Sequence, residues 1–232
     1  MFMAETTHDK LLAKELLLKV MELKQRTEIH WARKIWHMLG VSTLTLIYAF
    51  LPLSWSVGVF ALLWLAFVPF DFIRQQNQKL NDFLVHMFRP IMRQNELHKL
   101  AGTTFLLTGV LVVSLFFRRE IVILTLLFLA FADPIASYFG IRFGKDKIFG
   151  HKSLQGSMAA FFVCALIGFI YLYFYGLMFD RLIVISILCG LIGALAELIP
   201  VAKLDDNFTL PVLSAIALWI LFNLFGTLAV IG

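Results

Sequence analysis

Asp133 lies within an apolar stretch that runs from Ile121 to Ile141. An ionised carboxylate is costly inside the hydrocarbon of a membrane, so a residue of this kind is a functional candidate. Pro134 follows directly, and an aspartate before a proline is typical of a helix start, because the carboxylate caps N–H groups and the proline needs none. The pair predicts a broken helix, capped by Asp133, whose second piece presents partial positive charge at the membrane boundary. The alternative is a simple proline kink.

Glycine, hydroxyl and basic residues are concentrated in the stretch after Pro134. Glycine allows close backbone approach, hydroxyl groups add short hydrogen bonds, and basic side chains pair with phosphate oxygens, so the combination predicts a polyphosphate site. The residues assigned to it are Gly140, Arg142, Gly144, Lys145, Lys152, Ser153, Gly156 and Ser157. A Walker A motif is excluded, because Asp146 follows Lys145 and Gly140 stands one residue too close. Taken alone, Gly140 and Gly144 would indicate helix packing.

Acidic residues form a second group near the last apolar stretch. Asp205, Asp206 and Asn207 are adjacent, and neighbouring oxygen ligands suit Mg²⁺, which binds a few carboxylates together with substrate phosphates. The alternative is a helix N-cap with solvated aspartates. Glu197, shortly before Pro200, is a candidate proton acceptor, metal ligand or lysine partner, and the sequence leaves these three roles open.

Two further groups of charged residues border apolar stretches. Arg33, Lys34 and His37 open the first stretch, and Arg33 and His37 share one helix face near the lipid headgroups. Glu96 and Lys99 stand before the third stretch. Both groups are candidate contacts for lipid or phosphate, and the alternative for the first group is a juxtamembrane anchor.

Most of the chain is suited to holding these residues in a membrane. Of the 232 residues, 60% are hydrophobic and 15% are charged, which is more apolar side chain than a soluble core can bury. Several runs are long enough for a helix to cross the bilayer, and they lack the two-residue alternation of barrel strands. We therefore expect an all-α integral membrane protein with about seven transmembrane helices. The runs are 34–51, 53–72, 100–117, 121–141, 154–179, 182–200 and 208–231.

The N-terminal segment has a different pattern. Leucines at positions 11, 12, 16, 17 and 18 face away from lysines at 10, 14 and 19. This predicts an amphipathic interfacial helix in segment 1–32, ahead of a membrane domain over 33–232. Basic residues favour the cytoplasmic side, and with the N-terminus there, only Arg118, Arg119 and Arg181 fall outside. All the groups above then share the cytoplasmic face.

In order along the chain, these groups resemble the family of dolichol kinase, phytol kinase and CTP-dependent diacylglycerol kinase. The resemblance covers nearly the whole chain from Arg33 onward, and the order and spacing of its motifs are together specific. The matching residues are Arg33-Lys34-x-x-His37, Glu96-x-His98-Lys99-x-x-Gly102, Asp133-x-x-Ala136-x-x-x-Gly140-x-x-x-Gly144-Lys145, Lys152-Ser153-x-x-Gly156-Ser157-x-Ala159 and Asp205-Asp206-Asn207-x-Thr209-x-Pro211. One position departs from the pattern, because Gln155 stands where many members carry glutamate.

The resemblance implies that a phosphoryl group passes from CTP to a membrane lipid alcohol, giving the lipid monophosphate and CDP. The alcohol would be a polyprenol or dolichol, phytol or diacylglycerol. We expect Asp133, Lys152 and Glu197 at the reacting groups, with the stretch from Asp133 to Ser157 as the nucleotide loop. Mg²⁺ is the expected cofactor, and its expected ligands are Asp133, Asp205, Asp206 and Asn207.

Two other functions stay open from the sequence. A CTP:phosphatidate cytidylyltransferase, which makes CDP-diacylglycerol, has a similar middle loop but a C-terminal signature that is missing here. A lipid or anion transporter would need no acidic pairs beside the basic loops. A nucleic-acid partner is not expected at a net charge of +5, because the basic residues fringe apolar runs, where anionic headgroups explain them. The expected location is the plasma membrane of a bacterium or archaeon.

Overall fold

The structure is a computed structural model that describes residues 28–201 and 204–225. The predicted amphipathic helix therefore lies outside the described residues as far as position 27. The described elements are α2 (Trp31–Phe50), α3 (Leu53–Gln76), α4 (Gln78–Phe88), η1 (Gln94–Glu96), α5 (Gly102–Phe116), α6 (Arg119–Leu127), η2 (Phe128–Ala132), α7 (Asp133–Arg142), β1 (Lys147–Phe149), β2 (Lys152–Ser153), α8 (Leu154–Phe174), η3 (Phe179–Arg181), α9 (Leu182–Leu198) and α10 (Asp206–Leu224).

Long apolar helices dominate the described part of the chain. Within it, five helical stretches are long and apolar enough to cross a membrane, and α5 is a shorter apolar helix. The five stretches are Leu53–Gln76, Arg119–Arg142, Leu154–Phe174, Phe179–Leu198 and Asp206–Leu224. The prediction of an all-α membrane protein is confirmed. The number of seven spans and the orientation stay predictions, although α2 and α5 coincide with two of the predicted runs.

The predicted helix break at Asp133 is wrong. Asp133 has helical backbone angles, φ −58° and ψ −55°, and it caps nothing, since the stretch from Arg119 to Arg142 continues as one helix. The reason is a π turn at η2, which ends at Ala132, just before the Asp133-Pro134 pair. A π turn widens the helix by one residue, which allows the chain to pass a proline without ending. No helix N-terminus therefore points into the membrane boundary here.

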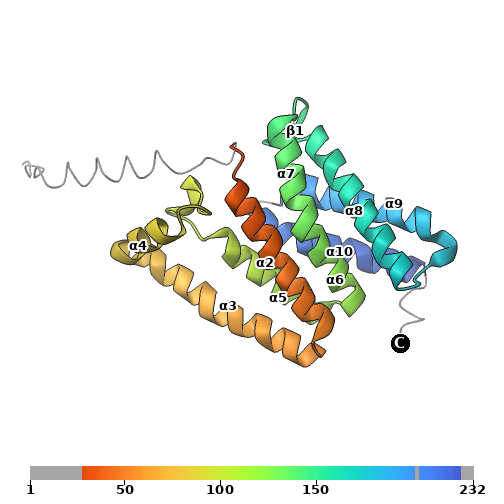
Figure 1. The fold of residues 1–232 in the computed structure, drawn as a ribbon, viewed down its shortest axis with the longest axis horizontal. Coiled ribbons are helices and arrows are strands. Elements are labelled where there is room, and N and C mark those ends of the chain that lie inside the picture. Colours follow the sequence, from red (N-terminus) through yellow and green to blue (C-terminus); the bar gives the residue numbers. More distant parts are fainter. Residues whose placement is uncertain (1–27, 202–203, 226–232) are drawn as a thin grey trace, which may run out of the picture.

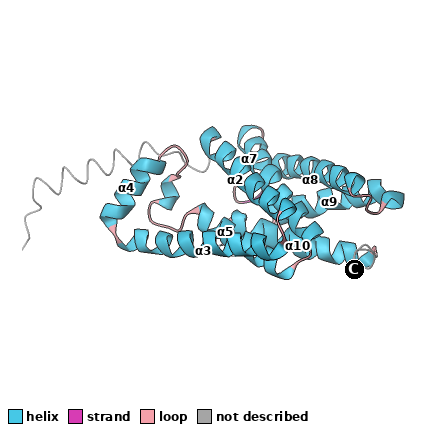
Figure 2. Cartoon of the chain, turned by 60° about the horizontal axis from the view of Figure 1, so that its bottom comes forward, coloured by secondary structure: helices cyan, strands magenta, loops and turns pink. Residues whose placement is uncertain are grey.

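The helices pack as a bundle, and the candidate site residues gather at one end of it. Figure 1 shows α2 beside the α6–α7 helix and α8 on the far side of α7. In Figure 2, α3 and α5 run together along one side of the molecule, and α7 and α8 along the other. Alternating helix directions bring the C-terminal ends of α3, α7 and α9 to the N-terminal ends of α2, α5, α8 and α10.

A short hairpin connects α7 to α8 at this end of the bundle. Strand β1 pairs antiparallel with β2, with Lys147 opposite Ser153 and Phe149 opposite Lys152. Gly150 forms the turn with a φ of +55°, a conformation that glycine adopts without steric cost. The hairpin turns Lys152 inward, so that its side chain is only 7% exposed.

Helices α8 and α9 approach each other through two reciprocal glycine contacts. A Cβ atom placed on Gly168 would lie 2.8 Å from the Cβ of Cys189, and one on Gly193 would overlap the side chain of Cys164. Both cysteines are buried free thiols, as expected for small apolar side chains in a membrane bundle. Small residues at such an interface allow the two backbones to come close.

This packing predicts that Gly193→Val destabilises the bundle. The added methyl groups must displace Cys164, and overpacking of this kind costs about 1–3 kcal/mol. The measurement is the thermal unfolding midpoint in detergent, by circular dichroism. Gly40→Val is the matched control, because a Cβ at Gly40 would meet no atom within 4 Å. Equal midpoints for the two variants would contradict the packing argument.

Candidate active site

A cavity of about 220 Å³ lies at the end of the bundle where these helix ends meet. It brings together side chains from α2, α7, the hairpin, α9 and the start of α10. The predicted site residues that line it are Arg33, Lys34, His37, Asp133, Gly140, Lys152, Ser153, Gly156, Glu197, Asp205, Asp206 and Asn207. Arg33 and Asn207, which are 174 positions apart in the chain, thus belong to one site.

Lys152 is the centre of the acidic side of the cavity. Its Nζ lies 2.9 Å from Glu197 Oε1 and 3.2 Å from Asp206 Oδ2, and it also donates to the Glu197 carbonyl oxygen. Burial by itself would lower the pKa of Lys152, but the carboxylates of Glu197 and Asp206 outweigh burial and raise the pKa. Lys152 is therefore a fixed positive charge at neutral pH. Of the three roles left open for Glu197, the geometry matches that of a lysine partner.

Asp133 lines the same cavity, beside basic side chains of α2. Its Oδ2 atom is 3.8 Å from His37 Nε2, which in turn lies 2.9 Å from the carbonyl oxygen of Leu129. Lys34 Nζ donates to the carbonyl oxygen of Pro134 at 3.0 Å. Leu129 lies in the π turn. In a π turn its carbonyl group would pair with the backbone N–H five residues later, but that residue is Pro134, which has no N–H. Side chains of α2 therefore fasten the π turn and border Asp133.

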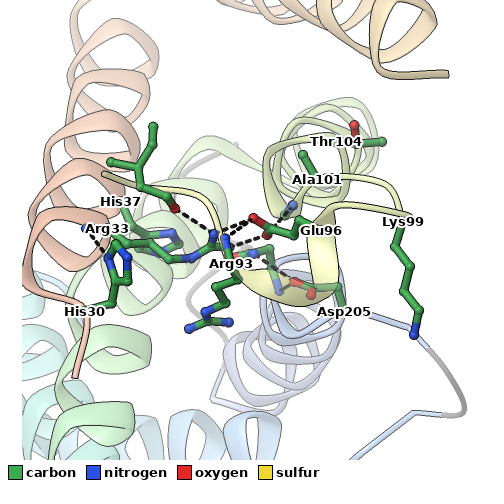
Figure 3. A network of polar contacts seen from close by, with 12 residues as sticks. His30, Arg33, His37, Arg93, Glu96, Lys99, Ala101, Thr104 and Asp205 are labelled. Atoms are coloured by element: carbon green, nitrogen blue, oxygen red, sulfur yellow. Dashed lines mark hydrogen bonds and ion pairs between the residues drawn. The ribbon is translucent and has the colours of Figure 1, made fainter. Parts of the chain in front are cut away.

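Arg33 forms a paired, two-pronged contact with Glu96, shown in Figure 3. Its two terminal nitrogens lie 2.8 Å and 2.7 Å from the two carboxylate oxygens of Glu96. The same carboxylate accepts the backbone N–H groups of Arg93 and Gly102, each at 3.1 Å. A Cβ on Gly102 would lie 2.7 Å from Arg33 Nη2, so any side chain at this position would have to displace Arg33. Glu96 therefore orients Arg33 and does not line the cavity.

The Glu96 carboxylate predicts a pH-dependent stability. Burial alone would raise the pKa of Glu96, but its hydrogen bonds and ion pair with Arg33 lower it below the usual value. A depressed folded-state pKa contributes stability above the unfolded pKa of about 4.3, and this contribution is lost as pH falls through the folded pKa. We expect Glu96→Gln to cost about 1.5–3 kcal/mol at pH 7.

The test is the thermal unfolding midpoint of wild type and Glu96→Gln across pH 7 to pH 3. The difference between the two proteins should be full at pH 7 and should shrink in acid, since protonation removes the same charge from wild type. Asp82→Asn, on α4, is the control. A difference that stays constant down to pH 3 would rule out the ionised Glu96 as its cause.

The predicted polyphosphate loop divides into two parts. Gly140, Lys152, Ser153 and Gly156 line the cavity, and a Cβ on Gly156 would lie 2.9 Å from the carbonyl oxygen of Ala136, so α7 and α8 also pack closely there. Arg142 and Lys145 are exposed, and Ser157 donates to the carbonyl oxygen of Ser153 at 3.2 Å. The predicted site residues outside the cavity lining are Arg142, Gly144, Lys145, Ser157, Glu96 and Lys99.

Lys147 and His151, both in the hairpin, line the cavity beside the predicted residues. His30 and Arg93 also line it, although no sequence motif indicated them. Lys99 is exposed, and Figure 3 shows its side chain directed away from the Arg33–Glu96 contact. Only the fold brings His30 and Arg93 to the site, so a sequence pattern offers no signal for them beyond their charge.

Asp205, Asp206 and Asn207 likewise divide between capping a helix and lining the cavity as candidate metal ligands. Asp205 caps α10, because its Oδ1 accepts the backbone N–H of Asn207 at 3.1 Å and the Asn207 amide at 2.8 Å. Among the described residues, no group of three or more His, Cys, Asp or Glu could hold a metal ion alone. Mg²⁺ commonly needs only one or two carboxylates when substrate phosphates and water complete its shell. Asp133 and Asp206, which line one cavity, fit that arrangement.

Three relatives are similar to this chain over much of its length. The CTP-dependent diacylglycerol kinase 1 of Schizosaccharomyces pombe is 37% identical over 146 residues, which cover 57% of this chain and 65% of the relative. The enzyme of the same name from Eremothecium gossypii is 31% identical, over 63% of this chain and 52% of the relative. An uncharacterized protein of Rickettsia prowazekii is 30% identical, over 77% of this chain and 88% of the relative.

The chain spans between half and two thirds of the length of these two fungal relatives. No protein-family model and no solved structure matches it. The relatives come from fungi and from a bacterium, so they do not favour a bacterial or archaeal membrane over a eukaryotic one.

Proposed function

The chain belongs to the family of the CTP-dependent lipid kinases, and from this premise we propose that it transfers the γ-phosphoryl group of CTP to the hydroxyl group of a membrane lipid. The products are a lipid monophosphate and CDP. Diacylglycerol is the first candidate substrate, because the two fungal relatives are named as kinases of that lipid. Polyprenols and phytol are the further candidates.

The observation that supports this function best is the single cavity that combines Asp133 with Lys34 and Lys152. Phosphoryl transfer requires little covalent chemistry from a protein, and depends on positioning and on neutralising the charge of the phosphates. Lys152 is a fixed cation in the wall of this cavity. The hydroxyl group of Ser153 and the glycines Gly140 and Gly156 line the cavity beside Lys152, where the two glycines let α7 and α8 pack closely.

Lys152 binds the phosphates of CTP in this mechanism, and Glu197 positions it. In the structure, Lys152 contacts both Glu197 and Asp206. A triphosphate offers several charged oxygens, so Lys152 can keep its contact with Glu197 while it exchanges Asp206 for a phosphate oxygen. Asp133 and Asp206 would hold Mg²⁺, which would supply positive charge to neutralise the phosphate oxygens.

Asp133 orients the lipid hydroxyl group and accepts its proton. A carboxylate within hydrogen-bond reach of the attacking hydroxyl group can do both. The oxygen attacks the γ-phosphorus in line with the bond to the β-phosphate oxygen, that bond breaks, and CDP leaves with the electron pair. His37 Nε2 lies 3.8 Å from Asp133 Oδ2, and Lys34 lines the same cavity, so basic side chains border this carboxylate.

The position of the cavity suits one soluble and one lipid substrate. It lies at the ends of apolar helices, where a nucleotide can enter from water and a lipid can enter sideways from one leaflet. Most basic residues of the predicted loops share this end of the bundle, which supports a cytoplasmic position for the cavity.

The test is an assay of the purified protein in lipid nanodiscs with Mg²⁺, each of the four labelled nucleoside triphosphates, and diacylglycerol, a polyprenol or phytol. We expect release of CDP and a lipid monophosphate from CTP. Pyrophosphate with a CDP-lipid would instead indicate a cytidylyltransferase. Flux of lipid or anion without nucleotide consumption would indicate a transporter, and either result would overturn the kinase.

A further inference from the structure

Arg93 lines the cavity and has no part in the mechanism above. It comes from the loop between α4 and α5, and among the described residues of that loop it alone reaches the cavity. Its position is set by its own backbone, because its N–H group donates to Glu96 Oε2 at 3.1 Å. Figure 3 shows the Arg93 guanidinium directed away from that carboxylate.

The loop that presents Arg93 is fixed to the end of α3 by a buried ion pair. Asp71 and Arg74 have side chains that are 2% and 3% exposed and lie 2.8 Å apart. The terminal nitrogens of Arg74 donate to the carbonyl oxygens of Glu96 at 3.2 Å and Lys99 at 2.9 Å. Asp71 Oδ2 accepts the backbone N–H of Ala101 at 2.8 Å. An arginine on such a loop has a defined place, unlike a mobile surface arginine.

Arg93 adds a positive charge to a cavity wall that already carries Arg33 and Lys34. Arg93 and Arg33 both lie close enough to Lys34 for their charges to repel it, and Arg93 also attracts Asp133. Like charges held together at a cavity wall favour an anionic ligand, because it relieves their repulsion. Arginine suits a phosphate group in particular, since two of its N–H groups can bind two phosphate oxygens at once.

We propose that Arg93 is a further phosphate-binding residue of this cavity, acting beside Lys34 and across from Lys152. The inference rests on the proposed function only for the origin of the phosphate, which is either the triphosphate of the nucleotide or the phosphate of the lipid product. In both cases the ligand is a phosphate ester with more than one negative charge.

The experiment compares wild type with Arg93→Gln and Arg93→Lys in nanodiscs of neutral lipid. Arg89→Gln is the matched control, because Arg89 is exposed on the same loop and does not line the cavity. Binding of inorganic tripolyphosphate with Mg²⁺ is measured by calorimetry, which needs no turnover. We expect Arg93→Gln to bind about tenfold to a hundredfold more weakly, corresponding to one lost charge-assisted hydrogen bond, with Arg93→Lys intermediate and Arg89→Gln unchanged.

Steady-state kinetics then separate the two sources of phosphate. A raised KM for CTP with an unchanged inhibition constant for the lipid monophosphate assigns Arg93 to the nucleotide, and the reverse assigns it to the lipid. Tripolyphosphate binding that is absent in wild type, or equal in wild type and Arg93→Gln, overturns the proposal. A wild type that binds tripolyphosphate but consumes no nucleotide overturns the kinase and leaves the role of Arg93 supported.

Discussion

Asp133→Asn is expected to lower phosphoryl transfer by about 10²–10⁴-fold, the usual effect of losing a positioned proton acceptor. Asparagine keeps the shape of the side chain but can neither accept the hydroxyl proton nor carry a negative charge toward a cation. The π turn before Pro134 and the neighbouring His37 depend on backbone contacts, which the substitution leaves in place. The variant should therefore fold, and its loss should appear in kcat. The measurement is CDP release in nanodiscs with CTP, Mg²⁺ and diacylglycerol.

Asp180→Asn is the matched control for this variant. Asp180 is an exposed carboxylate in η3, at the opposite end of α8 and α9 from the cavity. It should keep wild-type turnover, and both variants should keep the thermal unfolding midpoint of wild type. Wild-type turnover in Asp133→Asn would remove Asp133 from the mechanism. A lowered midpoint together with lost activity would assign Asp133 a structural role.

Lys152→Met should abolish nearly all activity, with a loss of about 10²–10³-fold or more, because one preorganised charge beside the phosphates disappears. The same change leaves Glu197 buried without its cation, and breaking a buried pair costs about 3–5 kcal/mol. Side-chain exposures of 7% for Lys152 and 8% for Glu197 justify that range. Loss of activity and loss of stability would therefore occur together in this single variant.

A second variant separates the two effects of Lys152. In Lys152→Met/Glu197→Gln the unpaired buried charge is gone, so stability should return to near the wild-type value. Activity should stay lost if Lys152 binds phosphate, whereas Glu197→Gln alone should keep measurable turnover because the lysine remains. Lys79→Met, on the exposed surface of α4, controls for loss of a positive charge. Activity that returns in the double variant would reduce Lys152 to a structural partner of Glu197.

The sequence by itself determined that the chain is a helical membrane protein and which groups matter. Hydrophobicity over twenty residues is a local property, and the low polarity of the bilayer leaves a helix as the main way to satisfy the backbone. For the same reason, a charged residue such as Asp133 stands out in an apolar run. The family motifs also predicted most of the residues that line the cavity, including Lys34, Lys152 and Asp206.

Local patterns failed where two helical conformations compete. Asp133-Pro134 has the sequence of a helix start, yet the chain continues through a π turn. The outcome depends on neighbouring helices, because His37 and Lys34 bind carbonyl groups on either side of the proline. No sequence window around Asp133 contains those partners.

Only the tertiary structure decided the roles of the other charged residues. Glu197 contacts Lys152, and Glu96 binds Arg33 and does not line the cavity, although the sequence offered each of them as a candidate site residue. Arg93 reaches the site because the buried ion pair at the end of α3 holds its loop. A buried charge must find its partner in space, and the partner's position along the chain is set by how the helices pack. That is why the sequence could name the charged residues and the fold had to pair them.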